Sequence, residues 1–134
     1  MNTAFLVLAV VFGIVAAVLH VAIFFMESVL WTRPTIWRRF GVASQEDAAT
    51  LQPMAYNQGF YNLFLGLAAG LGLLLLASRP VSSVGIGIAS VALASMLLAS
   101  IVLITSNPKL ARAAIMQGIT PLIALVFGAL WLLA

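Results

Sequence analysis

The sequence has no cysteine, one histidine, and only six basic and three acidic residues in 134 positions. Without cysteine the chain forms no disulfide, carries no thiol nucleophile and offers no thiolate ligand. One histidine and a few scattered carboxylates are too few ligands for a metal cluster, so no metal site is predicted. Soluble domains carry roughly 25% charged residues, and a chain with 7% cannot cover its surface in water.

The sequence instead contains four long apolar runs. Each reaches about 20 residues, the length that crosses roughly 30 Å of hydrocarbon. The runs are continuous rather than alternating, which argues against a transmembrane barrel. The first has no basic residue before it and is too long for a secretory signal. The sequence predicts an all-α, integral membrane four-helix bundle, one transmembrane domain over 1–134, with spans at about 3–26, 54–77, 84–105 and 113–133.

The basic residues are distributed unevenly between the two sides of such a bundle. The loop 27–53 holds three arginines, the loop 106–112 holds Lys109 and Arg112, and the opposite side has Arg79. Basic residues collect in cytoplasmic loops, so we expect a multi-pass protein of the cell inner membrane with both termini periplasmic. Because the basic residues do not form a run, no nucleic acid partner is predicted.

The loop 27–53 has its own local signals. Pro34 in the first turn and Gly41 at the end predict a short helix between the first two spans. Trp31, Trp37 and the neighbouring arginines suit an interfacial segment in the headgroup layer. Ser44 before two acidic residues is typical of a helix start.

Two prolines mark further helix starts. Pro53 is expected in the first turn of the second membrane helix. Asn107-Pro108 predicts the start of the fourth.

Most polar side chains outside the loops lie at the ends of the spans that alternation brings to one face. His20, Phe24, Glu27 and Trp31 are spaced to form one stripe. Polar groups are costly in lipid unless they find partners, and they usually point inward. We therefore expect one pocket at the cytoplasmic leaflet. Its further members come from the second and fourth spans: Asn57, Gln58, Tyr61, Asn62, Gln117 and Thr120.

These residues divide by chemistry. Glu27, His20 and Tyr61 are the catalytic candidates. Substrate-binding candidates are Asn57, Gln58, Asn62, Gln117 and Trp31. Purely structural interpretations stay open: the amides could bond one another or headgroups, Glu27 could meet water or Arg33, and His20 could be a hydrogen-bonded core residue.

Three runs carry a family resemblance: His20-x-x-x-Phe24-x-x-Glu27, Asn57-Gln58-Gly59-Phe60-Tyr61-Asn62, and Gln117-Gly118 before Pro121. Over nearly its whole length the chain resembles a family of small bacterial membrane proteins known as a domain of unknown function, number thirteen-oh-four. The resemblance implies a four-helix integral membrane protein and no particular activity.

The chemistry of the residues favours acid–base work on an apolar or lipid-like substrate from the bilayer, by isomerisation, hydration, epoxide opening or cyclisation. The cofactor stays unknown, and haem held by His20 between subunits is disfavoured. One alternative is a non-catalytic membrane or partner-binding module. Another is a proton-coupled small-molecule transporter working as an oligomer, although Glu27 lies at the edge of its span rather than at the middle. Membrane lipid, an apolar ligand and further copies of the chain are the expected partners.

Overall fold

The computed structural model describes residues 2–134, except for the side chain of Arg79. Four long helices account for most of the chain, and all four are long and apolar enough to cross a membrane. They are α1 (Thr3–Phe24), continued by a π-helical turn (Phe25–Val29), then α3 (Gln45–Leu76), α4 (Ser82–Ser106) and α5 (Ala111–Leu133). The short α2 (Pro34–Trp37) with a 3-10 turn (Arg38–Phe40) follows α1, and 3-10 turns also cover Arg79–Val81 and Pro108–Leu110.

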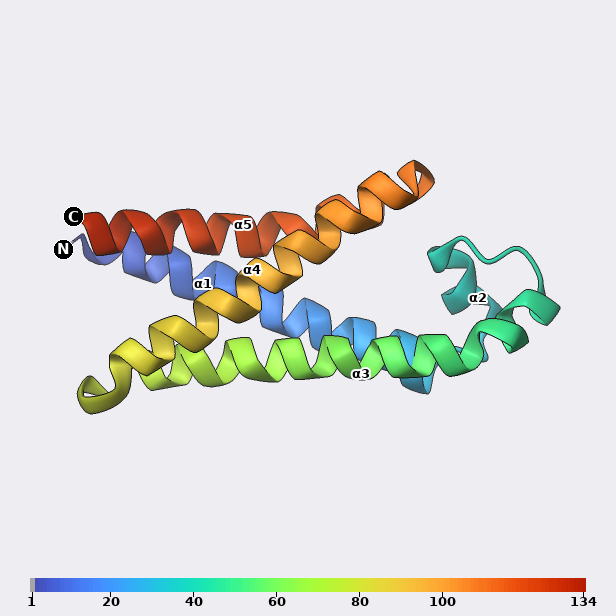
Figure 1. Cartoon of the computed structure of the whole chain (residues 1–134), viewed down its shortest axis with the longest axis horizontal. Helices are drawn as coiled ribbons and strands as arrows, with labels where there is room; N and C mark the ends of the chain where they lie inside the picture. Colours follow the sequence, from blue (N-terminus) through green and yellow to red (C-terminus); the bar gives the residue numbers. More distant parts are fainter. Residues whose placement is uncertain (1) are drawn as a thin grey trace.

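The long helices form an up-and-down bundle. Each packs against the next, and α5 returns beside α1, while the diagonal pair α1 and α4 barely touches. Both termini and the turn between α3 and α4 lie at one end, the terminal end (Figure 1). The other end, the α2 end, holds α2 and the turn between α4 and α5. The predicted all-α four-helix bundle is confirmed, and the chain is a multi-pass membrane protein.

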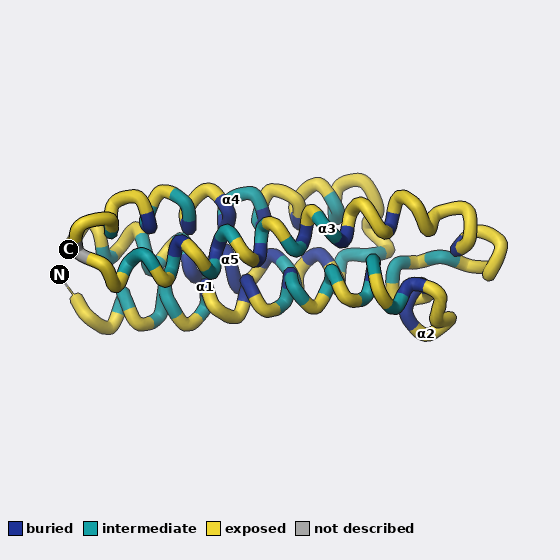
Figure 2. Tube along the Cα trace, turned by 90° about the horizontal axis from the view of Figure 1, so that it is seen from below, coloured by how far each residue is buried: buried dark blue, intermediate teal, exposed yellow. Residues whose placement is uncertain are grey.

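Small residues let the helices approach closely along a narrow buried core (Figure 2). A Cβ at Gly72 would lie 2.5 Å from the amide nitrogen of Ala89, so only glycine allows this contact between α3 and α4. Outside the core, bulky apolar side chains such as Val91 and Leu98 are exposed, as expected for a surface solvated by lipid. From the close contact at Gly72, α3 and α4 diverge toward the α2 end (Figure 1).

The predicted helix ends of the loop are confirmed. Pro34 occupies the first turn of α2, and Gly41 ends the following 3-10 turn with a φ of 79°. The Ser44 hydroxyl accepts from the amide of Asp47 at 3.0 Å and caps α3. Asn107 similarly caps the turn before α5 by accepting from the amide of Lys109 at 3.3 Å.

The prediction for Pro53 is wrong, since this residue lies inside α3 and does not begin it. The helix starts at Gln45, earlier than the predicted span. Proline inside a helix removes one backbone hydrogen bond, and tertiary packing compensates here. Ala48 and Ala55 are buried against Trp31 and Trp37, so the first turns of α3 are held by the loop that precedes them.

Candidate functional site

The regular winding of α1 changes at Phe25–Val29, where the chain makes a single π-helical turn. The amide of Leu30 donates to the carbonyl of Phe25 at 2.9 Å, five residues earlier. Glu27 lies in the middle of this turn and is buried. Single π-turns inside α-helices are rare and occur frequently at functional sites. Nothing in the composition of this segment predicted the turn.

Glu27 meets Asn62 of α3 in the interior. The Asn62 side-chain amide donates to the Glu27 carboxylate at 2.9 Å, and to the carbonyl of Gln58 at 3.1 Å. Both Glu27 and Asn62 are 8% exposed. Among the described residues no cationic side chain pairs with Glu27. A buried carboxylate that has an amide partner and no counter-ion is costly to keep charged.

The neighbouring contacts hold α1 and α3 together at this level; we name them the α1–α3 seam. A Cβ at Gly59 would lie 3.1 Å from the Cβ of Glu27 and closer still to Ser28, so glycine permits the approach. The Ser28 hydroxyl donates to the carbonyl of Tyr56 at 2.8 Å.

Aromatic side chains extend the seam on both sides of Glu27. The indole of Trp31 donates to the carbonyl of Ala48 at 2.9 Å. The rings of Phe24 and Phe60 meet edge to face at 5.1 Å. These contacts give α1 and α3 a fixed register, which is what places Glu27 opposite Asn62.

His20 lies two turns deeper in α1, roughly 10 Å from Glu27 along the helix axis. It is 1% exposed and is among the largest fully buried side chains, with Met96 and Pro121. Its Nδ1 lies 2.9 Å from the carbonyl oxygen of Ala16. Because a carbonyl can only accept, Nδ1 carries the proton in this bond, and Nε2 is an acceptor whenever the ring is neutral.

Three of the predicted site residues lie outside the buried seam. Asn57, Gln58 and Tyr61 are exposed. Tyr61 precedes Gly72 by three helical turns, so both lie on the face of α3 that is directed toward α4. Gly72 is buried there by Ala89, whereas Tyr61 is 55% exposed. The structure thus places Tyr61 on an open flank beside the Glu27–Asn62 contact.

The remaining predicted residues are dispersed. Trp31 is buried in the cluster that covers the start of α3. Gln117 is half-buried on α5. Thr120, one turn further along, is buried, and its hydroxyl oxygen has no hydrogen-bond partner among the described residues. The hydroxyls at the end of α4 bond carbonyls of their own helix, Thr105 to Ile101 and Ser106 to Leu103.

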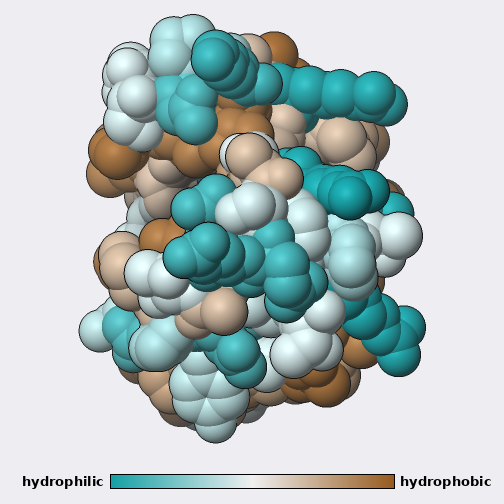
Figure 3. Space-filling view, turned by 90° about the vertical axis from the view of Figure 1, so that its right-hand side faces the viewer, coloured by the Kyte–Doolittle hydropathy of each residue, from teal (hydrophilic) through white to brown (hydrophobic). Residues whose placement is uncertain are grey.

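Figure 3 shows the α2 end with hydrophilic side chains spread over most of this face and apolar patches between them. The arginines of the loop after α1 contribute to this polar face, and Arg38 lies 5.2 Å from the ring centre of Trp37. No group of three or more histidine, aspartate or glutamate side chains in the described part of the chain is placed to hold a metal ion.

The sequence profile described as "Protein of unknown function (DUF1304)" matches residues 14–129. The chain belongs to this family. The matched range includes Glu27 and Asn62 and so covers the α1–α3 seam. No curated protein and no solved structure matches the chain.

Proposed function

We propose that this protein performs acid–base chemistry on an apolar or lipid-like substrate, with Glu27 as the proton-active group, at the cytoplasmic leaflet. The observation that carries the proposal is the buried Glu27 carboxylate, which is bonded by the Asn62 amide and has no cationic partner among the described residues. Buried carboxyl groups in such surroundings are typical of general acids and bases.

A purely structural role for Glu27 is the main competing explanation, because the contact also joins two helices. A structural contact needs only an acceptor for the Asn62 amide, and glutamine would supply one at a much lower desolvation cost. The hydroxyl of Ser28 and the indole of Trp31 already join the same helices without any charge. What a carboxyl group adds to the seam is a transferable proton, and this difference favours a site.

The roles follow from position. Glu27 gives or takes the proton, and Asn62 orients its carboxyl group. Tyr61 and Gln58, exposed beside the seam, are placed to contact a substrate that approaches from the lipid along α3. His20, with Nε2 as an acceptor, would relay a proton from deeper in the bundle. Isomerisation, hydration, epoxide opening and cyclisation can each proceed by proton transfer from such a set.

The cytoplasmic assignment rests on the basic residues. The α2 end carries Arg33, Arg38, Arg39, Lys109 and Arg112, and Arg79 is in the turn at the opposite end. The positive-inside bias then places the α2 end in the cytoplasm and both termini in the periplasm of an inner membrane. In this orientation Glu27 lies near the cytoplasmic headgroups, with α2 in the interface.

A hydrophobic carbodiimide tests whether Glu27 exchanges protons. This reagent partitions into the membrane and forms a stable adduct with carboxyl groups that carry a proton there. We expect an adduct on Glu27 by peptide mass mapping, and none on Glu46 or Asp47, which are exposed to water at the start of α3. The Met54→Ala variant, altered at an exposed position of α3 outside the candidate site, is the control and should react like the wild type.

Turnover is tested with a total membrane lipid extract. The extract is incubated with wild-type protein, with Glu27→Gln and with the control Met54→Ala. The lipids are then compared by mass spectrometry with separation of isomers. We expect a product with the wild type that is missing with Glu27→Gln. If Glu27 resists the carbodiimide and no lipid species changes, the enzyme proposal is overturned, and the non-catalytic module takes its place.

A further inference from the structure

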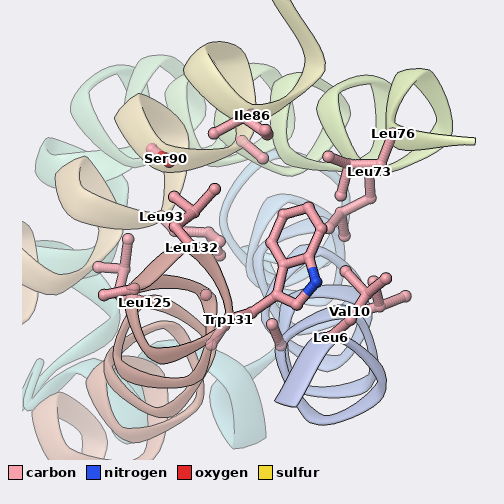
Figure 4. Close-up of a pocket in the computed structure, with 15 residues that line it drawn as sticks. Leu6, Val10, Leu73, Leu76, Ile86, Ser90, Leu93, Leu125, Trp131 and Leu132 are labelled. Atoms are coloured by element: carbon pink, nitrogen blue, oxygen red, sulfur yellow. The ribbon is translucent and has the colours of Figure 1, made fainter. Parts of the chain in front are cut away.

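A hollow lies at the terminal end of the bundle, far from Glu27. It has a volume of about 200 Å³ and is lined by all four long helices. In Figure 4 the indole of Trp131 lies at its centre, between the leucines of α5 and the side chains of α1. Representative lining residues are Leu6, Val10, Leu73, Ile86, Leu125 and Trp131.

The lining is unsuited to water. Its side chains are aliphatic or aromatic, apart from the hydroxyl of Ser90. A buried water needs two to four polar partners, and an engineered apolar cavity of about 150 Å³ stays dry and binds benzene. This hollow is larger than that cavity and offers only one hydroxyl and one indole N–H, so it is suited to bind hydrocarbon and not water.

We propose that this hollow holds one acyl chain of a bilayer phospholipid from the leaflet at the terminal end. Leu6 lies in the first turn of α1, and Trp131 lies in the last turn of α5, so the hollow begins close to the membrane boundary. The acyl chains of a phospholipid begin at this depth of the bilayer. Tryptophan side chains favour the same depth. The surrounding bilayer supplies such chains.

We take an intact phospholipid as the occupant because phospholipids make up the bilayer and the lining offers no specific partner for the carboxylate of a free fatty acid. No lining residue carries a charge, so nothing in the hollow would pair with a carboxylate. A phospholipid keeps its charged headgroup outside in the interface and inserts only the chain. The site is also independent of the proposed function, because Val10 and Glu27 are roughly 25 Å apart along α1.

Quenching of Trp131 fluorescence by brominated lipid tests the proposal. Purified protein in detergent micelles is titrated with phosphatidylcholine that carries bromine on one acyl chain. The emission of Trp131 is obtained by subtracting that of Trp131→Phe, since Trp31 and Trp37 contribute a background at the other end. We expect quenching that saturates at one lipid per chain, because a single site fills.

Two matched variants separate the hollow from the general lipid surface. Ala129 lines the hollow, and the phenylalanine of Ala129→Phe should fill it. We expect the affinity for the brominated lipid, measured by the saturable quenching, to fall at least about tenfold. Ala99 is exposed on α4, and Ala99→Phe adds the same ring to the lipid-facing surface and should leave the quenching unchanged. Ser90→Leu at the same hollow serves as a second filling variant if Ala129→Phe does not fold.

Two outcomes would overturn parts of this proposal. Quenching that rises in proportion to the lipid fraction, and equally in both alanine variants, would show surface contact only and overturn the proposal. Saturable quenching by a brominated fatty acid but not by the phospholipid would overturn the choice of occupant. Neither result bears on Glu27, whose carbodiimide reaction is measured separately.

Discussion

The side-chain amide of Asn62 and the carboxylate of Glu27 lie 2.9 Å apart in the interior, although 35 positions separate them in the sequence. The π-helical turn sets the direction of Glu27, and Gly59 sets the distance between the two helices. The hydrogen bond therefore depends on backbone geometry on both sides, so its loss should be measurable in the stability of the whole bundle.

Removing Asn62 should destabilise the protein more than neutralising Glu27. Asn62→Ala leaves a buried carboxylate without its donor, and we expect a loss of about 1–3 kcal/mol in the free energy of unfolding. In Glu27→Gln the new amide oxygen still accepts from Asn62, so folding is retained. The measurement is reversible unfolding in mixed micelles, with Asn57→Ala as the exposed control.

The double variant Glu27→Ala/Asn62→Ala, measured with its two single alanine variants, completes a thermodynamic cycle, because each alanine removes the hydrogen bond between positions 27 and 62. If the two side chains are coupled as the structure shows, the interaction energy should be about 0.5–3 kcal/mol. Simple additivity of the two single changes would contradict a direct contact between them.

The fold could be predicted because hydrocarbon leaves little choice of structure. Apolar runs of membrane-spanning length must be helical, and the caps at Ser44, Gly41 and Asn107 depend on neighbouring residues alone. The start of α3 could not be predicted in the same way. It is helical through Pro53 because the Trp31 and Trp37 side chains pack on it, and sequence patterns do not contain such long-range contacts.

Of the predicted site residues, Glu27 and Asn62 meet in the interior, whereas the others are exposed or dispersed. Spacing placed Glu27 and Asn62 at the same ends of adjacent helices. The π-turn and the close approach at Gly59 then decide which side chains meet, and neither has a signal in hydropathy. The hollow around Trp131 escapes prediction for a related reason, since helices that are apolar all round do not reveal which face is buried.

Glycines in α3 should differ sharply in their tolerance of alanine. A Cβ at Gly72 would lie 2.5 Å from the backbone nitrogen of Ala89, whereas a Cβ at Gly70 would meet nothing within 4 Å. We expect Gly72→Ala to cost about 1–3 kcal/mol, since two backbones must move apart. Gly70→Ala should be neutral or stabilising by up to about 1 kcal/mol through helix propensity. Thermal unfolding in one detergent compares the two, and equal midpoints would contradict the packing of α3 on α4.

Self-association is expected through an open face of α4. A Cβ added at Gly87 on this helix would meet no atom within 4 Å. Val91, one turn away, is 69% exposed. Small residues on lipid-facing helices permit close backbone approach between subunits. Mass measurement in lipid discs should show more than one copy per particle, and Gly87→Leu should shift the population toward the monomer. A wild-type protein that is monomeric at every concentration would refute this expectation.

The orientation of the bundle can be tested with cysteines, because the native chain has none. Ser44 is exposed at the α2 end, and Ser83 is exposed near the turn at the terminal end. With the basic residues of the α2 end held in the cytoplasm, a membrane-impermeant maleimide added outside spheroplasts should label Ser83→Cys. It should label Ser44→Cys only after the membrane is permeabilised. The opposite pattern would place Glu27 at the outer leaflet and move the proposed substrate there. Labelling of both from outside would contradict the crossing of α3, since one full span separates the two positions.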